Sequence, residues 1–214
     1  MIVLDDPEAL ASHVADWLTG LARAKQDAFA IALSGGTTPR LLYRTLAARD
    51  DFPWTRAEWY FGDERFVPPD DPMSNFRMAR EAMLFRAPRA SIHPIPTLGL
   101  APDDAARRYE DMLRARARPL FDVVLLGLGT DGHTASLFPG SAVLEERTRL
   151  VCVTENGRIT LTYPALESAS HIAFLVAGAE KRAMLARLAS RDQALPAARV
   201  KGAVEIFADK EAAG

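Results

Sequence analysis

Short, nearly continuous apolar runs alternate with helical patterns along the chain, and this order of elements leaves few fold classes open. The runs Phe29–Leu33, Phe121–Leu126 and His171–Val176 are five or six residues long and lead into glycine and polar residues. Strands of this kind, separated by helices, are typical of a mostly parallel sheet that is covered on both faces. We therefore predict an α/β fold with helices on both faces of such a sheet.

The remaining elements follow from the same patterns. Further strands are predicted at Ile2–Leu4, Glu58–Phe61, Leu150–Val153 and Ala203–Phe207. Apolar residues recur with a helical period in five other stretches, most of which proline or a capping serine opens. These predicted helices start at Pro7, cover Pro39–Ala48, run from the cap Ser74 to about Phe85, start at Pro102 and cover Ala179–Leu188.

The composition excludes several classes of protein. The 214 residues carry 26 Lys+Arg and 28 Asp+Glu, a net charge of 26 − 28 = −2, and 49% are apolar. The charge balance argues against nucleic-acid binding through a basic face, and the apolar fraction argues against disorder. We expect one domain, residues 1–214. No export signal or long uncharged run is present, so we expect a cytoplasmic protein without membrane contact, either a monomer or a homodimer.

The single cysteine carries little chemistry. With only Cys152, neither an internal disulfide nor a cysteine-based zinc site can form. The residue lies in the apolar run Leu150–Val153, so we predict an inert core thiol.

Three of the predicted strands, ending at Leu33, Phe61 and Leu126, run into glycine and polar residues. Ligands in open α/β sheets bind outside the carboxyl ends of the strands, so these three loops are candidate site loops. The first, Ser34–Pro39, is glycine-rich and precedes a helix, so its amides, hydroxyls and helix dipole suit a phosphate. A plain tight turn with a capping hydroxyl is the alternative.

The second loop, Gly62-Asp63-Glu64-Arg65, places two acids and a base at a strand end. A salt-bridged surface turn is one interpretation. The other is a carboxylate for proton handling beside an arginine for developing negative charge. The shared sheet edge favours the second.

The third loop, Gly127–His133, matches the pattern G-x-G-x-x-G after a strand, and Glu155 follows 23 residues after the last glycine. A dinucleotide site is therefore an alternative. However, Pro139-Gly140 interrupts the helix that such a site needs. We instead predict that His133 lies at a helix start as a neutral base, oriented by Asp131. A purely structural histidine at a turn is the alternative.

Two more cations are candidate ligands for an anion. Arg158 follows the turn at Asn156-Gly157, and Lys181 begins a helix after Gly178. A solvated lysine is the alternative for Lys181, because a cation at a helix N-terminus is mildly unfavourable unless an anion is bound there.

Together these stretches resemble the 6-phosphogluconolactonases, a family related to the glucosamine-6-phosphate deaminases. The matching residues are Ser34–Pro39, Asp63–Arg65 with Ser74-Asn75, Gly127–Gly140, Arg158–Thr162, Gly178 with Lys181, and Asp209. The resemblance implies a Rossmann-like α/β fold, no nucleotide cofactor and no metal. It also implies hydrolysis of 6-phospho-D-glucono-1,5-lactone to 6-phosphogluconate in the pentose phosphate pathway.

The resemblance also implies roles for individual residues. His133 would be the general base that activates water, Asp131 would orient it, and Arg65 would hold the lactone oxygen or a hydroxyl, beside Asp63. The 6-phosphate would be held by Ser34, Gly35, Gly36, Thr37, Arg158 and Lys181.

The sequence departs from the family pattern at two places. Thr154-Glu155-Asn156-Gly157 replaces a proline-rich run before Arg158, and Phe76-Arg77 replaces an aromatic-glycine pair. A deaminase and a non-catalytic sugar-phosphate sensor are the alternative functions. The deaminases are expected to have tyrosine where this chain has Arg65, and an Asn-Glu pair after the histidine, which this chain lacks.

Overall fold

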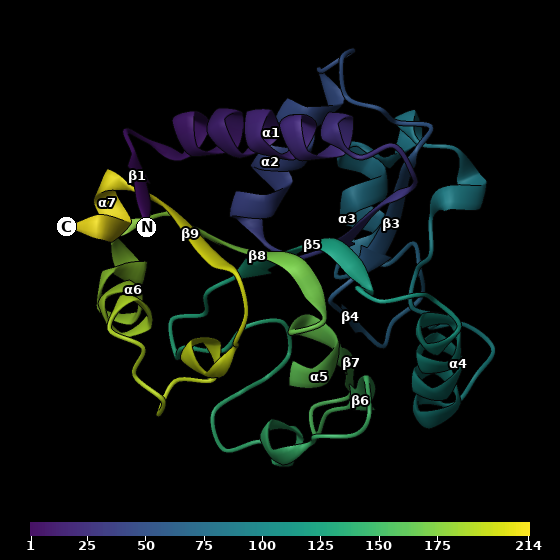
Figure 1. Ribbon diagram of the computed structural model, residues 1–214. Helices are drawn as coiled ribbons and strands as arrows, with labels where there is room; N and C mark the ends of the chain where they lie inside the picture. The colour runs from purple at the N-terminus through teal and green to yellow at the C-terminus, as the bar shows by residue number, and fades with distance from the viewer.

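The computed structural model describes all 214 residues and contains a six-stranded parallel sheet (Figure 1). Its strand order is β1-β9-β8-β5-β2-β3, and all pairs are parallel. The strands are β1 (Ile2–Leu4), β2 (Phe29–Leu33), β3 (Ala57–Phe61), β5 (Phe121–Gly127), β8 (Ala169–Val176) and β9 (Val204–Asp209). The predicted mostly parallel sheet is confirmed, and β5, β2 and β3 lie side by side, so their three loops meet at one edge.

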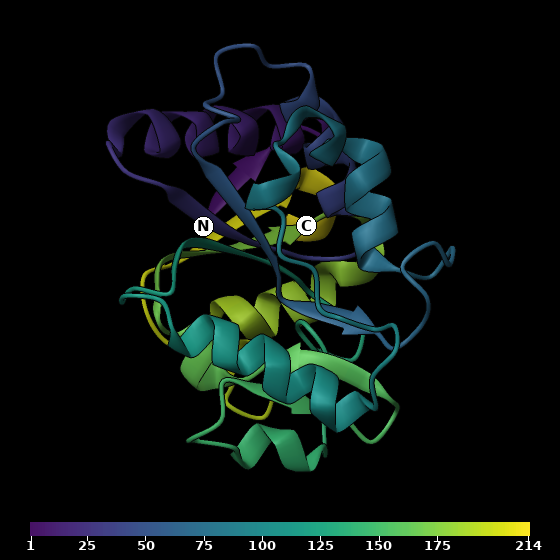
Figure 2. The ribbon, with the colours of Figure 1, turned by 90° about the vertical axis from the view of Figure 1, so that its right-hand side faces the viewer.

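Helices cover this sheet from two sides. Figure 1 shows α1 and α2 above the sheet and α5 below it, and Figure 2 shows α4 in the half of the molecule opposite α1. The helices are α1 (Pro7–Ala24), α2 (Thr37–Ala47), α3 (Asn75–Ala82), α4 (Pro102–Arg114), α5 (Tyr163–Leu166), α6 (Arg182–Ala189) and α7 (Lys210–Ala213). Short 3-10 turns lie at 84–86, 89–91, 142–145, 179–181 and 197–199. No helix reaches the length and apolarity that a membrane span requires.

Local sequence explains the limits of these helices. The Asp6 side chain accepts a hydrogen bond from the N–H of Ala9 at 2.7 Å and so caps α1. The Ser74 hydroxyl caps α3 in the same way through the N–H of Arg77, as predicted. α2 begins two residues before the predicted start at Pro39, because Gly36 already occupies the cap position.

A second, antiparallel sheet is the largest departure from the predicted fold. It has the order β4-β7-β6, with β4 at Asp63–Arg65, β6 at Val151–Val153 and β7 at Arg158–Leu161. The run Leu150–Val153 is therefore a strand, as predicted, but it does not join the parallel sheet. The segment predicted as a turn at Gly62–Arg65 continues as a strand after Gly62.

The predicted helix start at His133 is wrong. Residues 128–141 form turns, with one isolated antiparallel bridge between Thr134 and Leu137. Pro139-Gly140 and the positive φ of Ala135 (+48°) are incompatible with a continuous helix. No helix dipole therefore acts on His133, and the dinucleotide interpretation loses the helix that it requires.

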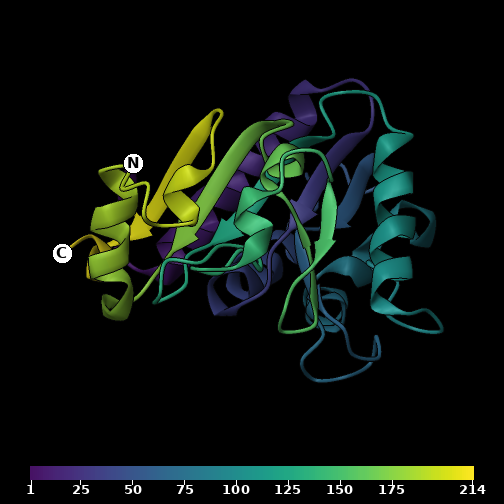
Figure 3. The same cartoon turned by 90° about the horizontal axis from the view of Figure 1, so that it is seen from below.

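One hydrophobic cluster of 60 buried residues holds these layers together. It extends from Leu10 on α1 to Ala212 on α7 and includes Val151 and Ile159 of the small sheet. The small sheet therefore shares the main core. Figure 3 shows the parallel strands from below, with both chain ends near the β9 side.

Candidate active site

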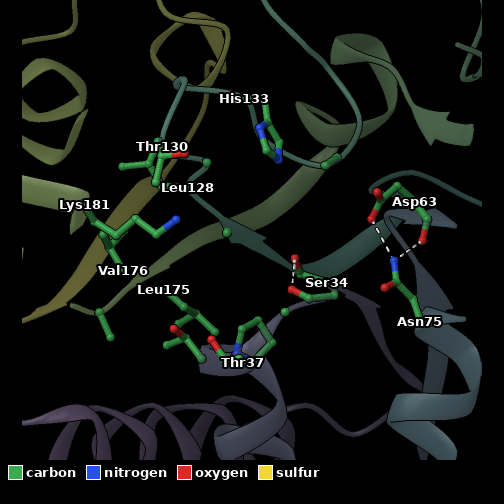
Figure 4. A pocket seen from close by; sticks show the side chains of 18 of the residues that line it. Ser34, Thr37, Asp63, Asn75, Leu128, Thr130, His133, Leu175, Val176 and Lys181 are labelled. Atoms are coloured by element: carbon green, nitrogen blue, oxygen red, sulfur yellow. Dashed lines mark hydrogen bonds between the residues drawn. The ribbon is translucent and has the colours of Figure 1, made fainter. Parts of the chain in front are cut away.

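A cavity of about 270 Å³ lies at the carboxyl ends of β2, β3 and β5 (Figure 4). All but one of the predicted site residues line it, although they come from distant parts of the chain. These are Ser34, Gly35, Gly36, Thr37, Asp63, Arg65, His133, Arg158 and Lys181. The exception is Asp131, which lies behind the His133 ring.

His133 and Asp131 form a bonded pair at the cavity wall. The Nδ1 atom of His133 lies 2.5 Å from Oδ1 of Asp131, and the same oxygen accepts the backbone N–H of His133 at 3.1 Å. With the Nδ1 proton donated to Asp131, the other ring nitrogen, Nε2, carries a lone pair. Figure 4 shows the ring pointing into the cavity.

Asp131 is held in its ionised form. Partial burial works to raise its pKa, but hydrogen bonds from the backbone and ring of His133 outweigh this, so the pKa lies below its ordinary value of 3.8. The carboxylate is thus charged across the neutral range and fixes both the tautomer and the orientation of the ring.

The Ser34–Thr37 loop presents backbone amides to the cavity. Gly36 has a φ of +106°, which favours glycine, and it precedes α2 without any side-chain cap. The first amides of α2 therefore keep their hydrogen-bonding capacity, and the positive end of the helix dipole adds to it. This is the arrangement that binds phosphate at helix N-termini.

Two buried tyrosine hydroxyls hold the loop ends in place. The Tyr43 hydroxyl donates to the carbonyl of Ser34 at 2.7 Å and accepts its N–H at 2.9 Å. The Tyr109 hydroxyl makes the same pair of bonds to Phe61, at 3.1 and 2.8 Å. Sequence reasoning missed both roles. The only available signal was a tyrosine on the apolar side of each helix.

Arg65 and Arg158 lie directly opposite each other on the adjacent strands β4 and β7 of the small sheet. They are direct partners in the β4–β7 register, and both line the cavity. Like charges directly opposite in an antiparallel pair are destabilising. Neither arginine has a carboxylate within ion-pair distance, and Lys181 has none either. The cavity therefore holds three uncompensated cations, which suits a multiply charged anion.

The ring of Phe138 contacts both His133 and Arg158. Its ring centroid is 4.4 Å from that of His133, and the guanidinium carbon of Arg158 lies 5.2 Å from the same phenyl centroid. Arg158 therefore keeps a defined position, even though the proline-rich run expected before it is absent.

Lys181 is placed by a turn that Asp209 anchors. The carboxylate of Asp209 is buried and accepts the N–H of Gly178 at 3.0 Å and the N–H of Ala212 at 2.8 Å. Gly178 has a φ of +97°, and the 3-10 turn that follows ends at Lys181. Asp209 thus acts on the site through the backbone.

Asn75 and Ser136 are site residues that sequence reasoning did not assign. Asn75 lines the cavity and bonds to Asp63 and Arg65, and buried Ser136 donates to Asp63. Gly35 makes room for Asn75, because a Cβ on Gly35 would stand 2.7 Å from the Asn75 Cγ. Both residues lie in stretches that match the family, Ser74-Asn75 and Gly127–Gly140. The sequence alone did not indicate which side chains they would bond to.

Glu64, next to Asp63, points to the start of α3. Its carboxylate accepts the N–H groups of Asn75 and Phe76 at 2.7 and 2.8 Å and the Ser74 hydroxyl at 3.0 Å. Burial raises its pKa, and these donors oppose the rise. Glu64 is therefore a structural group that joins β4 to α3.

The side chains of the site match neither a metal centre nor a dinucleotide site. No group of three His, Cys, Asp or Glu side chains is arranged to hold a metal ion. Glu155, the acid expected in a dinucleotide site, instead accepts the Ser141 hydroxyl at 2.7 Å and the N–H of Ala142 at 2.9 Å, and it does not line the cavity.

Comparisons with known proteins identify the family to which the chain belongs. A family model described as glucosamine-6-phosphate isomerases/6-phosphogluconolactonase matches residues 5–208. The 6-phosphogluconolactonase of Nostoc sp. is 46% identical over 200 residues, which cover 87% of this chain and 83% of that protein. The crystal structure of 6-phosphogluconolactonase from Thermotoga maritima matches with a TM-score of 0.85 at 31% identity and covers 97% of this chain and 98% of that one.

A monomeric glucosamine-6-phosphate deaminase also matches, with a TM-score of 0.85 at 21% identity, over 100% of this chain and 99% of that one. This similarity shows a shared fold alone. Fold and cavity together define an α/β protein with a cationic cleft at the carboxyl edge of its parallel sheet. The chain belongs to the glucosamine-6-phosphate isomerase/6-phosphogluconolactonase family.

Proposed function

We propose that this protein hydrolyses 6-phospho-D-glucono-1,5-lactone to 6-phospho-D-gluconate, with His133 as the general base and residues 1–214 acting as one catalytic domain. The observation that carries the proposal is that His133, bonded to Asp131, lines the same cavity as three unpaired cations. Two relatives named 6-phosphogluconolactonase, each 46% identical to this chain over the matched residues, support the choice of substrate.

The cavity suits the two ends of such a substrate. The 6-phosphate would lie against the Ser34–Thr37 amides, with Lys181 and Arg158 balancing its charge. The lactone end would then face the His133 ring, because His133 lies across the cavity from that loop in Figure 4. Phosphate binding thus holds the carbonyl carbon near the base, and this positioning lowers the barrier.

The reaction requires two proton transfers at His133. Nε2 takes a proton from water as the water oxygen bonds to C1 of the lactone, and the carbonyl oxygen becomes an oxyanion. The C1–O5 bond then breaks, and the imidazolium returns the proton to O5. The carboxylic acid product releases its own proton to solvent. Asp131 stabilises the imidazolium between these steps.

Arg65 is the proposed partner of the oxyanion. Its Nη1 donates to the carbonyl of Met73 at 2.6 Å and to Oδ1 of Asn75 at 3.1 Å, whereas Nη2 makes no hydrogen bond within the protein. A fixed cation with a free donor stabilises charge that develops in the transition state without reorganising.

The test is the excess rate over spontaneous lactone hydrolysis, measured by coupling product formation to 6-phosphogluconate dehydrogenase. The variant His133→Ala should lose about 10²–10⁴-fold in kcat, the usual contribution of a general base. His171→Gln is the matched control, since this half-buried histidine lies on β8 beside Glu205, outside the cavity. Unchanged turnover in folded His133→Ala contradicts the mechanism.

The alternatives are separated by substrate. Release of ammonia from glucosamine 6-phosphate would favour the deaminase alternative. Binding of 6-phosphogluconate without lactone turnover would favour a non-catalytic sensor. We expect lactone turnover and no ammonia, because Thr134 and Ser136, which follow the histidine here, are engaged in internal bonds and offer no acid for opening an amino sugar.

A further inference from the structure

A buried chain of hydrogen bonds connects the loop that carries His133 to the strand that carries Arg65. At its centre is the carboxylate of Asp63, only 5% exposed. Its Oδ2 accepts the hydroxyl of Ser136 at 2.5 Å, and its Oδ1 accepts Nδ2 of Asn75 at 3.2 Å. Both oxygens of Asp63 are therefore engaged within the protein.

Asn75 continues the chain to the arginine. Its Nδ2 also donates to the backbone carbonyl of Asp63 at 3.0 Å, and its Oδ1 accepts Nη1 of Arg65 at 3.1 Å. The Asn75 side chain thus uses both ends of its amide, and this fixes its orientation. Figure 4 shows its two bonds to Asp63. The same Nη1 of Arg65 also donates to the carbonyl of Met73 at 2.6 Å.

Ser136, at the other end of this series of hydrogen bonds, is also held in place. Ser136 is completely buried, and its N–H donates to the hydroxyl of Thr160 on β7 at 3.1 Å. Between Ser136 and His133 lies Ala135, a non-glycine residue with a φ of +48°. A backbone conformation of this kind persists only where its surroundings impose it, and here Ser136 is held on both sides.

We propose that Ser136 and Asn75 are positioning residues that act through Asp63 to set His133 against Arg65. The proposal rests on the hydrolytic function proposed above. It also changes the role of Asp63, from a residue that contacts the substrate to the residue that links Ser136 to Asn75 by hydrogen bonds. Its physical basis is that a displacement of about 1 Å at a reacting group can lower the rate about 10²-fold. The bonds of Ser136 go to Asp63 and Thr160 and none goes to the Ser34–Thr37 loop, so we expect loss of its hydroxyl to lower kcat and to leave phosphate binding largely intact.

The test is a double-mutant cycle with Ser136→Ala, Asn75→Ala and the double variant, each assayed for kcat and KM with the lactone. We expect Ser136→Ala to lower kcat about 10-fold or more and to change KM less than about twofold. The double variant should lose about as much as the worse single variant, because the residues act as one unit. The proposal is overturned if the loss of kcat in the double variant equals the product of the two single losses. It is also overturned if folded Ser136→Ala keeps the kcat of the wild type.

Thr19→Val is the matched control. Thr19 is buried in α1 far from the cavity, and its hydroxyl donates to the carbonyl of Ala15 at 2.7 Å. Removing this hydroxyl should lower stability without lowering kcat. A similar fall in kcat in Thr19→Val would mean that loss of any buried hydroxyl has this effect. That result would contradict a specific role for the series of hydrogen bonds that links Ser136 to Arg65.

A second readout needs no activity. The Nε atom of Arg65 is buried and makes no hydrogen bond, so exchange of its proton with solvent reports how firmly the side chain is held. We expect faster exchange in Ser136→Ala, measured by nitrogen-15 NMR, although Ser136 makes no hydrogen bond to Arg65. An unchanged exchange rate of the Arg65 Nε proton in Ser136→Ala would overturn the proposal. A wild-type protein that fails to accelerate lactone hydrolysis overturns the proposed function alone.

Discussion

Gly129 lies directly against the ring of His133. A Cβ added to Gly129 would overlap the imidazole and would stand 2.6 Å from Oδ1 of Asp131. The N–H of Gly129 also donates to the carbonyl of His133 at 2.8 Å, which holds the two backbones together. Glycine is required at this position by the space that the His133–Asp131 pair occupies.

The variant Gly129→Ala should therefore displace the pair and lower kcat about 10²-fold, as expected for a displacement of about 1 Å at a reacting group. Circular dichroism should show an intact fold, since Gly129 lies outside the helices and strands. Gly20→Ala is the control: no atom lies within 4 Å of its added Cβ in α1, so it should stabilise the helix by about 1 kcal/mol and keep full activity. Full activity in Gly129→Ala would show that the site tolerates the displacement.

Arg158→Gln should keep the thermal stability of the phosphate-free protein and reduce the stabilisation that phosphate gives. Without phosphate, the variant should melt no lower than the wild type, because the opposition of Arg65 and Arg158 is relieved. With inorganic phosphate at 100 times its Kd, the wild type gains about 2.7 kcal/mol. The variant should gain less at the same concentration.

Differential scanning fluorimetry over a phosphate series measures both effects. Arg107→Gln on α4 is the control, because this arginine is exposed, pairs with Asp104 and lies outside the cavity. An equal phosphate shift in wild type and Arg158→Gln would remove Arg158 from the anion site.

Glu110 should make stability depend on pH. Burial works to raise its pKa, but the N–H of Leu150 and the guanidinium groups of Arg149 and Arg114 outweigh this and leave the pKa below 4.5. A carboxyl whose folded pKa is lowered contributes stability above its unfolded pKa and loses it as the pH falls through the folded value. Glu110→Gln should cost about 1–3 kcal/mol at pH 7.

Urea unfolding from pH 7 to pH 3 tests this prediction. The difference in unfolding free energy between wild type and Glu110→Gln should stay constant down to about pH 5 and shrink below it. The control Glu81→Gln removes an exposed carboxylate paired with Arg77 at 2.7 Å. It should change neither the unfolding free energy at pH 7 nor its dependence on pH measurably. A difference that grows as the pH falls would contradict the assigned sign.

Cys152 should react slowly in the folded protein. Burial raises the pKa of its thiol to about 11, although the nearby Arg149 works to lower it. The nucleophilic thiolate is therefore scarce at neutral pH. Iodoacetamide at pH 7.5 should alkylate the thiol much faster in urea than in native buffer, as mass spectrometry can measure. Rapid alkylation of the native protein would refute the prediction of an inert thiol.

Much of this fold was readable from local patterns. β2 and β5 were predicted from their apolar runs, α1 and α3 from periodicity and capping residues, and the candidate loops from glycine at strand ends. The reason is that hydrophobic period, capping and turn preferences act over a few residues. The same local reasoning failed at His133, where an apparent helix start is a turn. Ala135 has a positive φ there, and the next residue, Ser136, is bonded to Asp63 across 73 positions of sequence.

The site depended on pairings that no local pattern contains. Strands β4 and β7 are separated by more than ninety residues, and only their antiparallel register sets Arg65 opposite Arg158. The amino-acid order was sufficient for the strands, the helices and the chemistry that each loop offers, because these depend on neighbours along the chain. Tertiary structure alone brought that chemistry into one cavity, because strand pairing and the buried Asp63 contacts join segments whose spacing in sequence carries no signal.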